Sequence, residues 1–113
     1  MEKQIRKGLD GVSPRDLTEV VLAYEPCWAI GTGRTATPDQ AEEAHDFIRS
    51  VLAALSDRAT ADRIRIQYGG SVKPDNVELL MREKNIDGLL VGGASLDPRS
   101  FAQIIRSTEA AMA

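Results

Sequence analysis

The sequence lacks the features that mark several classes of protein. Its single cysteine, Cys27, cannot form an internal disulfide, so we expect a reducing, cytoplasmic location. No apolar run approaches the roughly 18 residues of a membrane span, and the first residues lack the apolar core of a secretory signal. There is also no excess of positive charge. A net charge of −3 with scattered basic residues argues against nucleic acid or an anionic membrane as the main partner.

What remains is the composition of an ordinary soluble protein. The 113 residues are 42% hydrophobic and 27% charged, which suits one small α/β domain. Three short apolar runs, at residues 19–24, 64–68 and 86–91, are predicted strands. The first is continuous enough to suggest burial on both faces. Helical patterns separate the three, and repeated βα units predict a parallel sheet.

The first full helix has the clearest beginning. Thr37 is the expected N-cap, Pro38 occupies the first helical position, and Gln40 completes a capping box. Its apolar stripe is formed by Ala41, Ala44, Ile48, Val51, Leu52 and Leu55.

Shorter helices are expected elsewhere in the chain. One ends near Gly8, and a brief turn capped by Ser13 precedes the first strand. Another follows Pro74, and a third begins at Asp97-Pro98. The buried face of that third helix is expected to consist of Phe101, Ile104 and Ile105.

Glycines follow each predicted strand at its carboxyl end, where parallel α/β folds bind their ligands. The long loop over residues 25–36 contains Gly-Thr-Gly, and glycine pairs at 69–70 and 92–93 begin the next two loops. Backbone N–H groups beside glycines can hold an anion. We therefore favour one shared phosphate site over the alternative that these are tight turns only.

Two nucleotide-binding motifs do not fit these glycines. A Walker motif would need a glycine at Trp28 and a lysine at Arg34. A dinucleotide fingerprint would join strand to helix directly, whereas residues 25–30 intervene and the helix begins only near Thr37.

Glu25 stands directly after the first predicted strand. A loop glutamate is most often a solvated surface charge. Here it lies at the mouth of a buried strand and beside a glycine-rich loop that could close over it. Removing water from a carboxylate makes it a stronger base, which suits proton abstraction next to a carbonyl.

Three segments together resemble the triosephosphate isomerase family. Residues 23–33, Ala-Tyr-Glu-Pro-Cys-Trp-Ala-Ile-Gly-Thr-Gly, are similar to its sixth strand and lid loop. Residues 68–72, Tyr-Gly-Gly-Ser-Val, resemble its seventh loop, and residues 90–96, Leu-Val-Gly-Gly-Ala-Ser-Leu, its eighth. The resemblance implies an α/β fold: the last three βα units of a (β/α)8 TIM barrel plus the tail of a preceding helix. Residues 1–113 would then be a single partial domain, the C-terminal segment of the barrel.

The resemblance also implies an activity, that of an aldose–ketose isomerase. Glu25 would be the base that moves a proton between dihydroxyacetone phosphate and glyceraldehyde 3-phosphate through an enediolate. No cofactor or metal is implied, and the family suggests a cytoplasmic homodimer of glycolysis and gluconeogenesis. The implied phosphate-binding residues are Gly31, Ser71, Gly92 and Gly93. The implied lid hinges and latch are Pro26, Cys27, Trp28, Gly33, Arg34, Thr35, Ala36 and Tyr68, with Ser71 also serving the latch.

Cys27 departs from the aliphatic residue expected at the hinge centre, and we expect it to alter hinge kinetics at most. A complete barrel needs about 250 residues. The family's lysine, asparagine and histidine from earlier strands have no counterpart here. His45, among the apolar residues of the first full helix, is expected to be structural, and Lys73 does not match the family's lysine.

We therefore expect this chain alone to be inactive and poorly folded or self-associating, and to need the missing N-terminal barrel units as partners. Two alternatives remain. One is a non-catalytic phosphate-binding or assembly module that completes a barrel with a separate N-terminal chain. The other is a different phosphate-binding barrel, such as a sugar-phosphate epimerase, which would not be expected to carry the Glu25-Pro-Cys-Trp lid.

Overall fold

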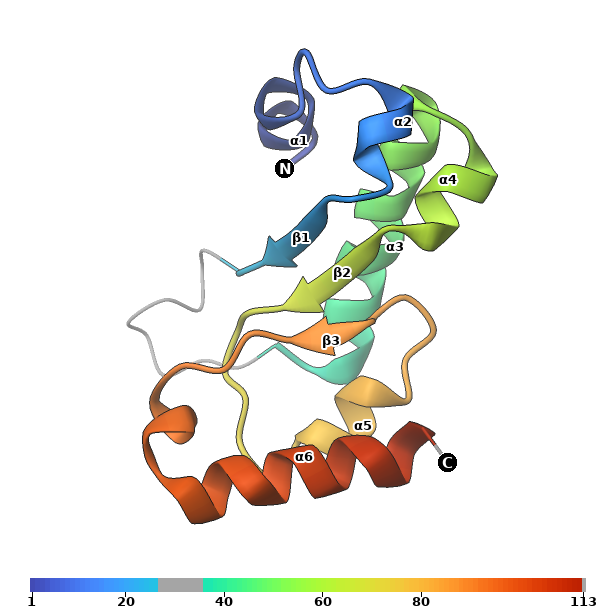
Figure 1. The fold of residues 1–113 in the computed structure, drawn as a ribbon. Coiled ribbons are helices and arrows are strands. Elements are labelled where there is room, and N and C mark those ends of the chain that lie inside the picture. The colour runs from blue at the N-terminus through green and yellow to red at the C-terminus, as the bar shows by residue number, and fades with distance from the viewer. Residues whose placement is uncertain (27–35, 113) are drawn as a thin grey trace.

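Three parallel strands form the centre of the protein (Figure 1). The computed structural model describes residues 1–26 and 36–112. Strands β1 (Val21–Tyr24), β2 (Arg65–Tyr68) and β3 (Gly88–Leu89) lie side by side in chain order. This confirms the predicted parallel arrangement of βα units. All three strands therefore present their carboxyl ends at the same edge of the sheet.

The helices are those expected from the sequence, with two additions, α4 (Arg58–Arg63) and the 3-10 helix η2 (Gly93–Leu96). Helix α4 was not predicted, because its six residues carry no apolar periodicity. Its N-cap is Asp57, whose carboxylate accepts a 2.7 Å hydrogen bond from the Thr60 N–H. No helix in the described ranges combines the length and apolar character that crossing a membrane requires. The helices are α1 (Glu2–Gly8), α2 (Pro14–Leu17), α3 (Pro38–Leu55), α4 (Arg58–Arg63), α5 (Val77–Met81), the 3-10 helix η2 (Gly93–Leu96) and α6 (Pro98–Met112).

Helix α3 begins as predicted. The Gln40 N–H donates to the Thr37 hydroxyl at 3.1 Å, and the Thr37 N–H donates to the Gln40 side-chain oxygen at 3.0 Å. Pro38 follows the cap, where its missing N–H has no consequence. The first turn is thus fixed by its own residues.

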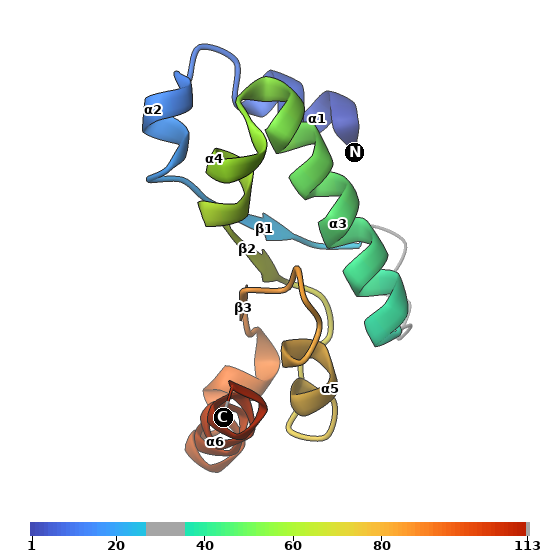
Figure 2. The same ribbon diagram turned by 90° about the vertical axis from the view of Figure 1, so that its right-hand side faces the viewer.

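Helix α3 covers one face of the sheet. It passes behind β2 in Figure 1, and the turned view in Figure 2 shows it standing to one side of the strands. Two apolar clusters fill the space between the sheet and its helices. One contains Leu17, Ile48, Leu52, Ala61, Ile64 and Ile66, and the other Ala36, Ala41, Tyr68, Val72, Val77, Leu80, Ile86 and Ile104.

Two expectations about burial were wrong. Strand β1 is not buried on both faces, since Val21 is 53% exposed while Leu22 packs on the helix side. On α6 only Ile104 is buried, whereas Phe101 and Ile105 are 39% and 46% exposed. The cause is the same in both places. Each element packs on one side only, and nothing else in the described part of the chain covers its other side.

Candidate functional site

The loops after the three strands begin as neighbours. The Tyr24 carbonyl accepts a 2.7 Å hydrogen bond from the Gly69 N–H, and the Tyr68 carbonyl accepts one of 2.9 Å from the Leu90 N–H. A Cβ on Gly69 would lie 3.3 Å from the Tyr24 oxygen, so a residue without a side chain suits this close approach. The strand carrying Glu25 and the two glycine-rich loops thus meet at one edge.

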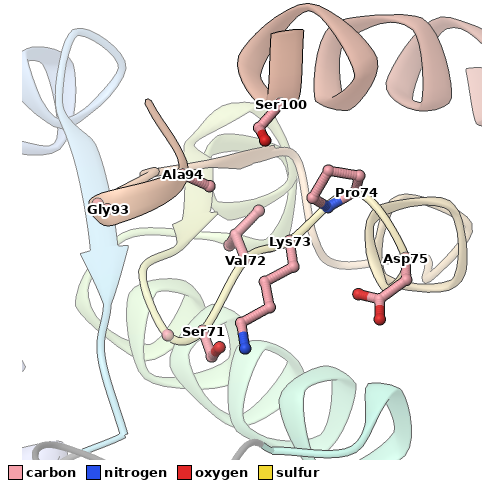
Figure 3. A pocket seen from close by; sticks show the side chains of 10 residues that line it. Ser71, Val72, Lys73, Pro74, Asp75, Gly93, Ala94 and Ser100 are labelled. Atoms are coloured by element: carbon pink, nitrogen blue, oxygen red, sulfur yellow. The ribbon is translucent and has the colours of Figure 1, made fainter. Parts of the chain in front are cut away.

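A cavity of about 630 Å³ lies between the two glycine-rich loops (Figure 3). It brings together three residues that the sequence suggested for phosphate binding, Ser71, Gly92 and Gly93. An added Cβ on either glycine would meet no atom within 4 Å, so the space above them is open. Its lining is formed by residues 70–75 and 92–94 together with Ser100.

Local hydrogen bonds hold both loops around this cavity. The Asn76 side chain donates to the Ser71 carbonyl at 2.8 Å and accepts from the Lys73 N–H at 2.9 Å. The Ser95 hydroxyl donates to the Gly92 carbonyl at 2.6 Å. Both loops are therefore tied to the short turns that follow them.

Lys73 lines the same cavity, although it does not match the family's catalytic lysine. Figure 3 shows its side chain reaching toward Ser71, while Asp75 points away beyond Pro74. An ammonium group at this place favours an anionic ligand. The sequence signal was its position two residues after Ser71, on the loop already suspected of binding phosphate.

Glu25 is exposed at the end of β1 and does not line the glycine-rich cavity. It borders a second cavity, of about 500 Å³, together with Tyr24, Ile48 and the α1 residues Gln4 and Ile5. The expected base and the expected phosphate loops therefore share one edge of the sheet, but they do not share one cavity.

Tyr68 has an unusual environment for a buried tyrosine. Its side chain is fully buried, and its hydroxyl forms no hydrogen bond with any atom in the described ranges. A Cβ on Gly70 would collide with that hydroxyl. Burial raises the pKa of Tyr68, and the nearby Ala36 N–H opposes that rise. The hydroxyl is thus held between Gly70 and the Ala36 backbone.

The implied hinge and latch residues are only partly described. Pro26 and Ala36 border the undescribed stretch and are both buried, and Ala36 belongs to the same apolar cluster as Tyr68. The remaining suggested residues lie outside the described part of the chain: Cys27, Trp28, Gly31, Gly33, Arg34 and Thr35.

A buried arginine lies at the amino ends of β2 and β3, away from the proposed site. Arg49 donates to the Asn85 side-chain and backbone oxygens at 2.9 and 3.0 Å, and to the Ala61 and Ile64 carbonyls at 2.8 and 2.9 Å. It also forms a 2.7 Å ion pair with Asp87. Sequence reasoning missed this arginine. Its only signal was a charge on the side of α3 that also carries Ile48 and Leu52.

Over residues 1–26 and 36–112, no three His, Cys, Asp or Glu side chains gather as metal ligands would.

Fold and site together define a class of protein. Parallel βα units with a ligand-sized cavity among the loops after the strands are typical of (β/α)8 barrels, and this chain holds three such units. The sequence profile described as Triosephosphate isomerase matches residues 1–108. The chain belongs to the triosephosphate isomerase family.

Individual relatives agree with this assignment. The triosephosphate isomerase of Geotalea uraniireducens is 60% identical over 109 residues, which cover 96% of this chain and 43% of that protein. The one from Herpetosiphon aurantiacus is 61% identical over 103 residues, covering 91% and 41%. That of Citrifermentans bemidjiense is 56% identical over 109 residues, covering 96% and 43%. This chain thus spans less than half the length of the relatives it matches.

Proposed function

We propose that this chain supplies the catalytic base and the phosphate-binding loops of a triosephosphate isomerase. One observation carries the proposal. The two loops expected to bind phosphate line a single cavity, and the first of them begins at Gly69, which is hydrogen-bonded to Tyr24, the residue that precedes Glu25. The membership of the family supports the same reaction and the same substrate class.

In the proposed reaction the Glu25 carboxylate removes a proton from the carbon beside the substrate carbonyl. The electron pair of the broken C–H bond forms the enediolate double bond, and the carbonyl oxygen takes up the negative charge. The hydroxyl proton of the deprotonated carbon then passes to the former carbonyl oxygen. Glu25 returns its proton to the former carbonyl carbon, and the hydroxyl-bearing carbon becomes the new carbonyl. The enediolate charge needs hydrogen-bond donors or cations around its oxygen. The resemblance assigns these to a lysine, an asparagine and a histidine of earlier strands.

The substrate phosphate would be held in the cavity between the two loops. Ser71, Gly92 and Gly93 would offer backbone N–H groups, and Lys73 would add a positive charge at the rim. Gly31 is proposed as a fourth contact, and residues 27–35 as a lid with Tyr68 and Ser71 as its latch. These assignments follow the family resemblance.

The partner required by this proposal is the remainder of the barrel. The open face of α6 borders an apolar groove of about 530 Å³, lined by Leu90, Phe101, Ile105 and Met112 among others. The further βα units of the barrel would cover this face and supply the missing electrophiles. The homodimer and the cytoplasmic location are retained as predictions.

The test is to supply the missing units as a separate polypeptide. The N-terminal part of the Geotalea uraniireducens relative, up to the region that matches this chain, serves as this N-terminal complement. We expect the complex to isomerise glyceraldehyde 3-phosphate. Glu25→Gln is expected to lower kcat about 10²- to 10⁴-fold, the usual contribution of a general base.

Glu19→Gln is the matched control, because it removes the same charge at the opposite end of β1. It should leave kcat within about twofold, as exposed substitutions away from the site usually do. A folded complex that binds inorganic phosphate but never isomerises would favour the alternative of a phosphate-binding module. Full activity in Glu25→Gln would reject the role of this carboxylate.

A further inference from the structure

The proposed mechanism leaves one buried titratable side chain unused. His45 on α3 is fully buried, and its Nε2 atom has no hydrogen-bond partner within the described part of the chain. Its Nδ1 atom lies 3.2 Å from the Asn85 carbonyl oxygen. Since a carbonyl only accepts, Nδ1 carries the proton, and Nε2 of the neutral ring is a buried lone pair without a donor.

The imidazole lies between the two tyrosines that end β1 and β2. Its centroid is 5.7 Å from that of Tyr24 in an edge-to-face arrangement at 87°, and 6.2 Å from that of Tyr68 at 41°. Tyr24 and Tyr68 are register partners in the sheet. Aromatic pairs at these separations and angles fix each other's orientation.

Each of these tyrosines leads directly into the proposed site. Tyr24 immediately precedes Glu25. The Tyr68 hydroxyl is confined between Gly70 and the Ala36 backbone, so a tilt of the ring would move it against Gly70 or away from Ala36. One imidazole therefore packs behind three parts of the site: the base, the glycine-rich loop and the start of α3.

We propose that His45 is a positioning residue whose neutral imidazole orients Tyr24 and Tyr68, and through them Glu25 and the Tyr68 hydroxyl. Its catalytic consequence rests on the proposed isomerase function, whereas the orientation of the tyrosines does not. A substitution that keeps the bond to Asn85 but removes the ring should therefore disturb the site.

Protonation is the natural way to perturb this arrangement. Burial lowers the pKa of His45 below its ordinary value, against the raising effects of the Asn85 carbonyl, Glu42 and Asp87. A proton added at Nε2 would have no acceptor among the described residues. The groups facing His45 are Glu42 and Arg49 from α3, Asp87 before β3, Tyr24 from β1 and Tyr68 from β2.

The carboxylates among these groups are already engaged. Glu42 accepts hydrogen bonds from the Asn85 backbone and side chain, and Asp87 is paired with Arg49. Because the folded-state pKa is lowered, His45 stabilises the fold above its ordinary pKa. That contribution is lost as the pH falls from the unfolded pKa through the lowered folded one.

The experiment uses the complex with the N-terminal complement, in which only this chain carries isotope labels. Acidification from neutral pH is followed by nuclear magnetic resonance of the His45 ring, the Tyr68 ring and the Ala36 amide. We expect Tyr68 and Ala36 to change together with His45, below pH 6.5. In His45→Phe this inflection should vanish, although Glu42 and Asp87 remain. Leu52→Ala, a buried change in the other apolar cluster, should retain it.

His45→Asn gives a second, independent readout, because its amide can still donate to Asn85 while the ring is lost. We expect displaced Tyr68 and Ala36 signals at every pH and a kcat reduced about tenfold or more, as misplaced catalytic groups produce. Leu52→Ala should lower stability without that loss of kcat.

Two results would overturn the proposal. An unchanged inflection in His45→Phe would assign the effect to the carboxylates. If the Tyr68 and Ala36 signals do not shift while His45 titrates, the histidine has a structural role only. If the complex lacks isomerase activity, the proposed function fails, but the resonance measurements still decide the role of His45.

Discussion

The two long helices of this chain meet the rest of the structure in different ways. Helix α3 has 18 residues and buries six of them, including the polar His45 and Arg49. Helix α6 has 15 residues and a similarly amphipathic sequence, yet it buries only Ile104. The difference separates a helix whose apolar side is covered within this chain from one whose apolar side is largely exposed.

The α3 side is held to the rest of the structure by a paired buried arginine. Arg49 joins α3 to Asn85 and Asp87, on the segment before β3, and a buried arginine persists only where its donors are used. Among the described residues, α6 forms no buried ion pair of this kind. It presents the exposed apolar side chains Phe101, Ile105 and Met112, a pattern that marks an interaction surface.

Arg49→Ala should break the α3 side with the largest effect. It removes the ion pair of Asp87 and the donor to the Asn85 side-chain oxygen, and breaking a buried pair costs about 3–5 kcal/mol. Urea denaturation of the complex with the N-terminal complement measures the loss. Arg82→Ala removes an exposed pair with Glu78 and should cost less than about 1 kcal/mol. Equal losses of stability in Arg49→Ala and Arg82→Ala would contradict the view that the buried Arg49 contacts hold α3 in place.

Neighbouring isoleucines sharpen the comparison on α6. Ile104 is 3% exposed, so Ile104→Ala should lower the free energy of unfolding by about 2–5 kcal/mol. Ile105 is 46% exposed, and Ile105→Ala should leave folding nearly unchanged but weaken binding of the N-terminal complement about tenfold, or ~1.4 kcal/mol. Titration of the labelled chain measures this affinity. Unaltered binding by Ile105→Ala would mean that the open face of α6 is not the contact.

The smallest expected difference in stability is between two glycine substitutions. Gly70→Ala places a methyl group against the Tyr68 hydroxyl and should cost about 1–3 kcal/mol, as overpacking usually does. Gly92 has a φ of −88° and open space around it, so Gly92→Ala should stay within about 0.5 kcal/mol. Thermal unfolding of the two variants makes the comparison. If Gly70→Ala matches Gly92→Ala, the Tyr68 ring is free to move, and the argument for its confinement fails.

Features determined by neighbouring residues could be predicted from the sequence. The start of α3 depends on atoms of Thr37 and Gln40, three residues apart, so the capping pattern was sufficient. The shared cavity of Ser71, Gly92 and Gly93 could also be anticipated, because parallel strands bring the loops at their carboxyl ends together.

Features that depend on residues far apart in the sequence, or on what covers an exposed face, could not be predicted. Arg49 meets Asn85 across 36 positions, and nothing near either residue indicates that pairing. The exposure of Val21 and Ile105 depends on what covers the second face of each element, which no local periodicity reveals. The placement of Glu25 in a different cavity from the glycine-rich loops was missed for the same reason.

The self-contained first turn of α3 has a consequence for how such a protein can change. The helix is capped by Thr37 and Gln40, with Pro38 at its first position, so this cap is encoded within the helix start itself. Pro26 and Ala36, which flank residues 27–35, are both buried against the rest of the structure. A substitution within residues 27–35 can therefore change the proposed lid without removing the hydrogen bonds that cap α3.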